Sequence, residues 1–327
     1  MPYYQTVMKR RGFLKNTSTA ATALTLFPGL ITSCGSKNLS TIGVQLFSLP
    51  KLLENDFRGS IKLLAKMGYR EVEMFGPFPF SVDSVKEGWR ALEPLLGFSG
   101  SGYFGHSSKE VKAILNEFDI KATATHTDME TMQTRMPLLG EAADQLGFEY
   151  VGLPAIPEEK RKTLDDYKRV AEEFNKIGEQ AKEVGLKFAY HNHGYGLQEM
   201  DGQIPLNILL EESDPSLVFF EMDIYWTIAG GADPVHYFES YPGRYQLMHI
   251  KDMKEKARFS GDGGSPSQWV ELFPYMSTVG TGVLDIPAII SAAEKSGVHH
   301  FYVEQDFVQN PEVALKESFD YLKAIKL

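Results

Sequence analysis

The amino-acid sequence predicts a single closed (β/α)8 barrel, a TIM barrel of the α/β class, and three observations support this fold. Apolar runs rich in β-branched and aromatic residues alternate with stretches of helical periodicity after residue 41. Eight such runs can be counted. Several helical stretches end on a glycine just before the next run, as helices do when the chain turns back into a strand. Strands and helices in this alternation are the pattern of the barrel.

The expected elements follow one another in a regular order. The strands are expected at 42–49, 69–75, 120–127, 150–156, 186–193, 217–224, 245–251 and 300–305. The expected helices include 61–67, 111–118, 164–184 and 313–325. Gly68, Gly147, Gly185 and Gly297 stand at helix-to-strand junctions. Because glycine readily adopts the left-handed conformation that ends a helix, this repetition indicates serial units of strand and helix.

An open, doubly wound sheet is the alternative fold. Such a sheet places a glycine-rich phosphate loop directly after an early strand. No expected strand here leads directly into a GxGxxG or GxxxxGK[ST] loop. The glycine-rich stretch 261–265 lies instead within the long segment 252–282. We expect this segment to be a loop, either one that covers the functional site or a plain surface loop.

The first 33 residues resemble an export signal. Lys9, Arg10 and Arg11 precede an apolar run over 20–31, and Ile-Thr-Ser then leads into Cys34, the only cysteine. This order is typical of a twin-arginine signal that ends in a lipoprotein cleavage box. We expect 1–33 to be removed, 34–40 to be a tether and 41–327 to be the catalytic domain. A lipid on Cys34 would make the protein a periplasmic or surface lipoprotein of the cell envelope.

The charge of the chain bears on its partners. The chain has 33 basic and 43 acidic residues, a net charge of −10. Removal of 1–33 would take away four basic residues and no acidic residue, which leaves a net charge of −14. Nucleic-acid binding depends on basic residues that neutralise phosphates. We therefore expect no nucleic-acid partner and a small-molecule substrate instead.

Polar side chains that can bind metals stand at the ends of the expected strands in the second half of the chain. Since side chains alternate along a strand, four pairs are expected to share a face: His191 with His193, Glu221 with Asp223, His249 with Lys251, and Glu304 with Asp306. Such groups are costly to bury unless they pair or bind a cation. The carboxyl ends of barrel strands form the active site, so a divalent metal site is predicted there.

Asp223, His249 and Glu304 are the leading candidates for the metal ligands, because they end three consecutive expected strands. Two carboxylates and one imidazole with open positions suit Mn²⁺, Mg²⁺, Co²⁺ or Zn²⁺. A fourth ligand is expected from His191 or His193, which the spacing does not separate. Each leading candidate also has a structural alternative. These are a helix N-cap for Asp223, a core histidine for His249, and an ion pair with a lysine for Glu304.

Six stretches of the sequence together resemble a known family. They are IGVQLFS (42–48), MGYREVE (67–73), YHNH (190–193), MDIYW (222–226), MHIKD (248–252) and VEQD (303–306). On these stretches the chain from residue 42 to its end is similar to the xylose isomerase-like TIM-barrel superfamily, whose members are often labelled sugar phosphate isomerases/epimerases. The YHNH stretch resembles relatives of inosose dehydratase and of enzymes that act on 3-keto sugars and their glycosides.

This resemblance implies one divalent cation, held by Glu, Asp, His and a second Glu from strands 5 to 8. The last three correspond to Asp223, His249 and Glu304. The first does not carry over, because this chain reads His191-Asn192-His193 where many members read Glu-Asn-His. In epimerases of the family the two glutamates are the acid/base pair. Elimination or hydration next to a ketone is therefore an open alternative to epimerisation.

The expected chemistry is proton abstraction next to a ketone, because a bound metal acts as a Lewis acid that stabilises the charge left when the proton departs. Candidates for the catalytic acid or base are Glu304, Lys251, His126 and His191. A solvated lysine is the alternative for Lys251, and a structural role is the alternative for His126.

Four further side chains are expected to contact the substrate: Glu73, His193, Trp226 and Tyr225. Trp226 and Tyr225 would offer an apolar face to a sugar ring, and packing in the core is their alternative. A structural role is the alternative for Glu73.

The leading functional hypothesis is a metal-dependent isomerase or epimerase that acts on a keto-sugar. The sugar is expected to be unphosphorylated, since no phosphate cradle is recognised. The same site could serve a lyase or hydratase acting on 3-keto-glycosides, and a non-catalytic carbohydrate-binding lipoprotein is the second alternative. A nuclease of the same superfamily would need more metal ligands and a basic groove, which the net charge opposes. The sequence makes no prediction about the oligomeric state.

Overall fold

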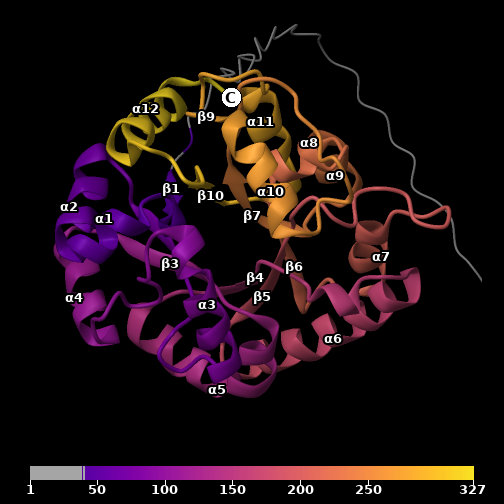
Figure 1. The fold of residues 1–327 in the computed structure, drawn as a ribbon, viewed down its shortest axis with the longest axis horizontal. Helices are drawn as coiled ribbons and strands as arrows, with labels where there is room; N and C mark the ends of the chain where they lie inside the picture. The colour runs from indigo at the N-terminus through magenta and orange to yellow at the C-terminus, as the bar shows by residue number, and fades with distance from the viewer. Residues whose placement is uncertain (1–38, 40) are drawn as a thin grey trace, which may run out of the picture. The chain divides into compact units, whose positions relative to one another are not determined.

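Eight parallel strands close into a barrel in the order β1-β10-β7-β6-β5-β4-β3-β2. The computed structural model describes Leu39 and residues 41–327, so the expected signal and all of the expected tether except Leu39 lie outside the described residues. Helices surround the barrel, as Figure 1 shows. The predicted (β/α)8 fold is confirmed.

The barrel strands are shorter than predicted. They are β1 (Gly43–Gln45), β2 (Glu71–Phe75), β3 (Lys121–His126), β4 (Tyr150–Leu153), β5 (Lys187–His191), β6 (Val218–Asp223), β7 (Tyr245–Ile250) and β10 (His300–Val303). Each lies within one of the eight predicted runs. Residues 46–48 form a 3-10 helix rather than the end of a strand. His193 and Glu304 follow the ends of β5 and β10 and belong to loops.

The helices pack around the outside of the barrel. They are α1 (Pro50–Asn55), α2 (Phe57–Met67), α3 (Asp83–Leu96), α4 (Ser108–Glu117), α5 (Met129–Leu146), α6 (Leu164–Glu183), α7 (Pro205–Glu212), α8 (Ile224–Ala229), α9 (Pro234–Ser240), α10 (Pro266–Leu272), α11 (Ile286–Ser296) and α12 (Pro311–Ala324). The four predicted helices correspond to α2, α4, α6 and α12. Within the described part of the chain, no helix combines the length and apolar character needed to cross a membrane.

The four junction glycines behave as predicted. Gly68, Gly147, Gly185 and Gly297 have φ angles of 118°, 93°, 78° and 111°. Three of them are the C-cap residues of α2, α5 and α11, and Gly185 follows the C-cap of α6. The left-handed backbone that glycine tolerates therefore returns the chain from helix to strand.

The segment 252–282, predicted as a loop over the site or a plain surface loop, contains short strands and a helix. Strands β8 (Asp252–Met253) and β9 (Met276–Ser277) pair antiparallel, and α10 lies between them in the sequence. The Asp252 carboxylate is buried and accepts four backbone N–H groups at 2.8 to 3.2 Å. The donors are Met253, Gly280, Gly282 and Leu284. The Asp252 side chain, the last residue of the MHIKD stretch, thus joins the start of this segment to the chain around its end.

One GxGxxG spacing does occur in the chain, at Gly100, Gly102 and Gly105. It follows α3 rather than a strand, and Ser107 beyond it caps α4. It is therefore not placed as the phosphate loop of a doubly wound sheet, and the closed barrel excludes that alternative fold.

Side chains fill the inside of the barrel in levels. Five of them form a small apolar cluster: Ala124, Tyr150, Ala189, Leu247 and Tyr302. Because side chains alternate along a strand, the residues two positions further along β3, β5 and β7 also point inward, and these are all histidines. The level above the apolar cluster is therefore polar.

Candidate metal centre

Ten polar side chains meet above the apolar level of the barrel. We call the deeper set the inner cluster; it consists of Gln45, Glu73, His126, His191, Glu221 and His249. We call the set at the mouth the outer cluster; it consists of Asp223, Lys251, Glu304 and Asp306. Glycine makes room for one imidazole, since a Cβ at Gly152 would lie 2.6 Å from Cδ2 of His126.

Glu221 links two imidazoles in the inner cluster. Its Oε2 atom lies 2.6 Å from Nε2 of His126 and 3.1 Å from Nδ1 of His191. Burial opposes ionisation of Glu221, but the imidazoles of His249 and His126 outweigh it and hold the pKa of Glu221 well below its usual range. Glu221 is therefore an anion inside the barrel.

Glu73 holds the opposite side of the inner cluster. Its Oε2 atom accepts a hydrogen bond from Nε2 of Gln45 at 2.7 Å and lies 2.6 Å from Nε2 of His249. Burial, and then the charge of Glu221, raise the pKa of Glu73. The Oε1 atoms of Glu73 and Glu221 are buried and have no hydrogen-bond partner among the described residues. Such unpaired acceptors are costly unless positive charge lies nearby.

Lys251 joins the three carboxylates of the outer cluster. Its Nζ atom lies 2.7 Å from Oδ2 of Asp306, 2.8 Å from Oε2 of Glu304 and 3.1 Å from Oδ2 of Asp223. Burial opposes the charge of Lys251, but these carboxylates outweigh it and raise the pKa of Lys251 well above its usual value. Lys251 is buried, so the alternative of a solvated lysine is wrong.

Two of the structural alternatives, the helix cap for Asp223 and the lysine ion pair for Glu304, are present, and both side chains still lie in the outer cluster. The Oδ1 atom of Asp223 accepts the Trp226 N–H at 2.9 Å and caps α8, whereas its buried Oδ2 atom has no hydrogen-bond partner among the described residues. Glu304 pairs with Lys251, and its Oε2 atom also lies 2.7 Å from Nδ1 of His249. Each carboxylate therefore combines a structural contact with a place in the cluster.

His191 and His249 each stand between the two clusters. His249 has Nε2 beside Glu73 and Nδ1 beside Glu304. His191 has Nδ1 beside Glu221, and its Nε2 atom lies 3.8 Å from Oδ2 of Asp223. A neutral imidazole has one N–H donor and one lone pair. If Nδ1 of His191 and Nε2 of His249 each donate a proton to the neighbouring glutamate, Nε2 of His191 and Nδ1 of His249 each present a lone pair toward the mouth.

This pairing fits a cation held at the outer cluster. A carboxylate behind a metal-binding histidine fixes the tautomer and the orientation of the ring. Burial, and then the neighbouring His249, lower the pKa of His191 to about 4, which keeps that imidazole neutral and able to ligate. His249 differs: the carboxylates around it overcome its burial and raise the pKa of His249 well above its usual value.

Two overlapping groups of side chains offer ligand atoms within 4.8 Å of one another. One comprises Asp223, His249 and Glu304, the set predicted from the sequence. The other comprises His126, His191, Glu221 and His249. The donor set of the first suits a divalent cation. The buried Oδ2 atom of Asp223 accepts no hydrogen bond from the described residues, and the Lys251 ammonium lies 3.1 Å from it.

The remaining predicted site residues have different places. His193 lies beside this site, with its ring 4.5 Å from that of Trp269 and 5.9 Å from that of Trp226. His191, with a nitrogen beside Asp223, is thus better placed than His193 to supply a fourth ligand. Trp226 is buried, and its ring lies 5.1 Å from Nζ of Lys251.

The structure places two of the predicted substrate contacts in the interior, as their alternatives expected. Tyr225 is fully buried and its hydroxyl donates to the carbonyl of Leu272, so the packing alternative holds. Glu73 lies in the inner cluster, bonded to Gln45 and beside His249, so its role is structural with respect to the substrate. His126, a predicted catalytic candidate, also lies in the inner cluster with its Nε2 atom beside Glu221.

The site contains functional candidates that were absent from the predicted set: Gln45, Glu221, Asp306 and Trp269. Glu221 and Asp306 could have been included from strand alternation, since they share a face with Asp223 and Glu304. Gln45 and Trp269 carry no such signal, because one lies at the short strand β1 and the other in α10.

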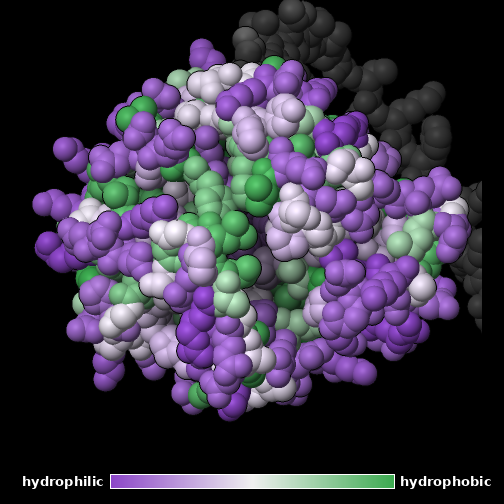
Figure 2. Space-filling model, in the orientation of Figure 1, coloured by the Kyte–Doolittle hydropathy of each residue, from purple (hydrophilic) through white to green (hydrophobic). Residues whose placement is uncertain are grey.

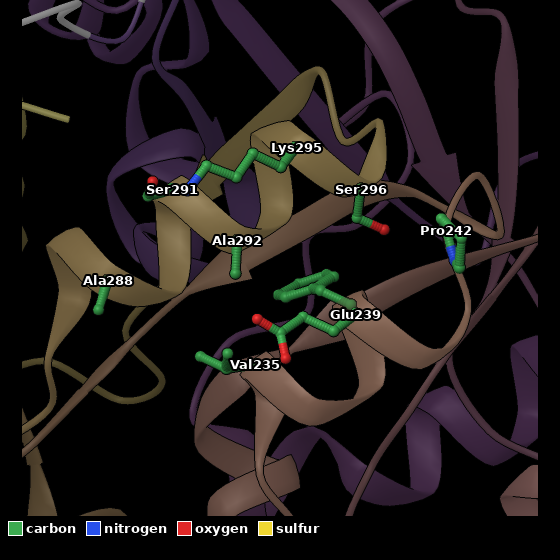
Figure 3. A pocket seen from close by; sticks show the side chains of 9 residues that line it. Val235, Glu239, Pro242, Ala288, Ser291, Ala292, Lys295 and Ser296 are labelled. Carbon is green, nitrogen blue, oxygen red and sulfur yellow. The ribbon is translucent and has the colours of Figure 1, made fainter.

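A separate pocket lies on the outside of the barrel, between α9 and α11. Figure 3 shows the carboxylate of Glu239 in the space between the helices, whereas the side chain of Lys295 runs along α11. The lining includes Val235, Phe238 and Ala292 and none of the clustered histidines. This pocket is therefore distinct from the candidate metal centre.

Comparisons with known proteins agree with this architecture. Residues 61–325 match the family model described as xylose isomerase-like TIM barrel. An inosose dehydratase of Clostridium tetani is 28% identical over 210 residues, which cover 63% of this chain and 67% of that protein. An inosose dehydratase of Lacticaseibacillus casei is 30% identical over 161 residues, 47% of this chain and 53% of that protein. The chain thus spans between half and two thirds of these relatives.

Solved structures show the same fold. A sugar phosphate isomerase/epimerase from Parabacteroides distasonis superposes with a TM-score of 0.66 at 25% identity, over 90% of this chain and 96% of that one. The IOLI protein, solved with a zinc atom, gives a TM-score of 0.59 at 16% identity, over 86% and 95% of the two chains. Because the family model covers most of the sequence, the chain belongs to the xylose isomerase-like TIM-barrel family.

Proposed function

We propose that this protein is a divalent-cation-dependent enzyme that removes the proton next to the ketone of an unphosphorylated keto-sugar or cyclic keto-polyol. The observation that carries the proposal is the convergence of Asp223, His249 and Glu304 on one another, with Lys251 at the same place. Loss of a hydroxyl as water is the favoured outcome, because the relatives named above are inosose dehydratases. Isomerisation or epimerisation is the outcome predicted from the sequence, and it needs the same first step.

Asp223, Glu304, His249 and His191 are the residues that would hold the cation. When bound, the cation supplies Lewis-acid polarisation of the substrate carbonyl. The zinc atom in the IOLI structure supports a metal in this fold. In the inner cluster, Glu221 and Glu73 would keep the rings of His191 and His249 in place.

The outer cluster offers the proton-transfer groups. Burial raises the pKa of Asp306 to about 6, which suits a base that works near neutral pH. Lys251 and His249 overcome the effect of burial and hold the pKa of Glu304 well below its usual range, so Glu304 is the weaker base. Because Glu304 is also one of the residues that would hold the cation, whereas Asp306 lies outside both metal-capable groups and beside Lys251, we assign proton abstraction to Asp306.

Lys251 would orient Asp306 rather than donate a proton, because its Nζ atom lies 2.7 Å from Oδ2 of Asp306 and its pKa is raised well above the usual value. In a dehydration, the C–H bond next to the ketone breaks and its proton goes to Asp306. The C–O bond on the next carbon then breaks, and the hydroxyl leaves as water with the proton that Asp306 had taken up. His126 and His191 both lie within hydrogen-bond distance of Glu221. They would position neighbouring groups and would not exchange protons with the substrate.

The test is to incubate the protein with inosose and with methyl 3-keto-β-D-glucoside in D₂O and to follow both by NMR. Elimination would give an unsaturated ketone product, epimerisation would give deuterium at an inverted carbon, and exchange alone would give deuterium with retention. Absence of all three with the metal-loaded protein would contradict the proposal. Tight binding of the sugar without turnover or metal dependence would favour a carbohydrate-binding protein.

The metal content of Asp223→Ala completes the test. We expect stoichiometric metal in the native protein and its loss in the variant. Asp285→Ala is a matched control, because Asp285 also caps a helix, accepting the Ala288 N–H at 3.1 Å. If both variants lose metal equally, the loss reflects a weakened cap and not a missing ligand.

A further inference from the structure

A row of aromatic rings leads from the outer cluster to the surface. Trp226, under Lys251, lies 6.2 Å from the ring of Phe273; Phe273 lies 4.9 Å from Phe307; and Phe307 lies 6.1 Å from Phe47. We call these four residues the rim band. Trp226 lies in α8, Phe273 just before β9, Phe307 after β10 and Phe47 after β1. Trp226 is buried, whereas Phe47, Phe273 and Phe307 are at least partly exposed, so distant parts of the sequence contribute to one apolar surface. Aromatic faces of this kind bind planar apolar groups.

Phe307 is the unusual member of the rim band. Its side chain is 42% exposed, although a large aromatic ring is normally buried. Its backbone has a φ of 51°, a conformation that a bulky residue rarely adopts. Backbone strain of this sort persists where the surrounding structure enforces it, and it is frequent at ligand sites. Phe307 directly follows Asp306, so the strained residue adjoins the proposed base.

The rim band is continuous with the polar site. The Gln305 N–H donates to Oγ of Ser48 at 3.2 Å, which ties the segment before Phe307 to the residue after Phe47. Phe47 also contacts Phe75 at the end of β2, at 5.2 Å. Figure 2 shows hydrophobic side chains gathered near the centre of the face in view, beside a hollow. A single ligand could therefore contact the cation site with one part and the aromatic rings with another.

We propose that the rim band binds a planar apolar group, best an aromatic ring, carried by the same substrate whose keto-sugar part lies at the outer cluster. The substrate class is then an aryl keto-glycoside or a similar conjugate, rather than a free sugar. This inference rests on the proposed function, because the polar part of the ligand is placed by the cation site. A free sugar would leave Phe307 exposed and its strained backbone without a role.

The experiment compares three probes on the full, metal-loaded chain: methyl 3-keto-β-D-glucoside, phenyl 3-keto-β-D-glucoside and phenol. Binding is measured by titration calorimetry with Asp306→Asn in place of the native chain, so that turnover does not consume the probe. We expect the phenyl keto-glucoside to bind at least about tenfold more tightly than the methyl compound, because an additional ring leaves water. Phenol alone should bind weakly, since it lacks the polar anchor.

Phe307→Gly, introduced in the same background, identifies the site of the preference. Glycine adopts a positive φ without strain, so this substitution removes the ring while it relieves the backbone. We expect the phenyl preference to fall to within about threefold, with binding of the methyl compound unchanged. Asp119→Gly is the matched control, because Asp119 is exposed and has a φ of 54° at the junction of α4 and β3. It should leave both affinities unchanged.

Equal affinities for the methyl and phenyl compounds would overturn the inference, as would equal effects of Phe307→Gly on both. If neither compound binds while the metal is present, the proposed function fails together with the inference. If the methyl compound binds and reacts but the phenyl group adds nothing, only the inference fails. Sedimentation would then decide whether the rim band joins two copies of the chain, since a dimer that Phe307→Gly dissociates assigns the band to a protein contact.

Discussion

Glu221 is the residue that most changes the view of this site from the one predicted by the sequence. Glu221 lies two residues before Asp223 on β6, deeper in the barrel, and contacts His126 and His191 rather than the groups at the mouth. A carboxylate in this position orients an imidazole for metal binding, and loss of such a partner commonly weakens metal affinity by about 10- to 100-fold. Glu221 therefore acts on the metal-binding histidine and not on the substrate.

Glu221→Gln tests this role. The amide keeps the shape of the side chain but removes its charge, so we expect the affinity for Mn²⁺ or Zn²⁺ to fall by about 10- to 100-fold while the fold is kept. Competition with a chelating dye measures the affinity. Glu71→Gln is the control, since Glu71 also pairs with a histidine, His300 at 2.9 Å, away from the metal-capable groups. An unchanged metal affinity in Glu221→Gln would contradict the role of Glu221 in orienting the histidine ligands.

Proton release provides a second test at this scale. The surrounding carboxylates raise the pKa of His249 well above its usual value despite its burial, so the cation-free imidazole carries a proton. A ligating histidine must be neutral. Cation binding should therefore release a proton, and the affinity should increase as the pH rises. Calorimetric titration in two buffers of different ionisation enthalpy measures the release; identical heats in both would contradict it.

At the scale of single residues, the sequence was most informative where strand ends carry charge. Asp223, His249 and Glu304 were found because they end consecutive strands, and they do approach one another. Glu73 and Tyr225 lie in the interior for different reasons. Glu73 is one of several inward positions whose depth depends on the stagger of the barrel, and Tyr225 lies after the end of β6, where α8 turns its side chain into the core.

Among the elements, the segment from β8 to β9 depends on one side chain. Asp252, the first residue of β8, accepts backbone N–H groups from Met253 beside it and from Gly280, Gly282 and Leu284 beyond β9, so it joins the two ends of this segment. An isolated loop of this length would have to satisfy those groups with water. The buried carboxylate instead fixes the segment that carries Phe273 and Trp269 beside the site.

Asp252→Asn should destabilise the protein. An amide has one acceptor oxygen, so at least one backbone N–H would face an NH₂ group, and we expect a loss of about 2–4 kcal/mol in the free energy of unfolding. Urea denaturation measures this loss. Asp285→Asn is the control, because asparagine caps a helix as well as aspartate does and the change should stay within about 0.5 kcal/mol. Equal stability of both variants would contradict the role given to Asp252.

The elements that could be predicted were those with a strong period of their own. Hydrophobic alternation and junction glycines located all eight barrel strands. The pieces of 252–282 escaped because β8 and β9 have two residues each and are formed by pairing with each other, which no local pattern records. The ends of β5 and β10 were also extended too far, since polar residues beyond a strand look like its continuation.

At the scale of the whole molecule, the excess of negative charge at the site indicates that a positive charge has to compensate it. The two clusters hold five carboxylates and one lysine: Asp223, Glu304 and Asp306 surround Lys251, whereas Glu73 and Glu221 lie among the histidines. Buried charges of one sign are costly without compensation. Protonated imidazoles can supply part of the positive charge. A divalent cation would supply it without protonating a ligand.

The location of the molecule in the cell remains a prediction from the sequence, as residues 1–33 and Cys34 lie outside the described residues. The full chain should be recovered with membranes and released by detergent when it is produced in a host with twin-arginine export and lipoprotein processing. Cys34→Ser should move it to the soluble fraction. Recovery of the native chain in the soluble fraction would contradict the lipid anchor.

The central claim is that one cation is held by Asp223, His249 and Glu304. The most direct measurement is an anomalous difference map from crystals grown with Mn²⁺ or Zn²⁺. We predict one peak at about 2.0–2.3 Å from a carboxylate oxygen of Asp223, a carboxylate oxygen of Glu304 and Nδ1 of His249. A map without a peak between these three side chains, or with its peak bound elsewhere, would contradict the account.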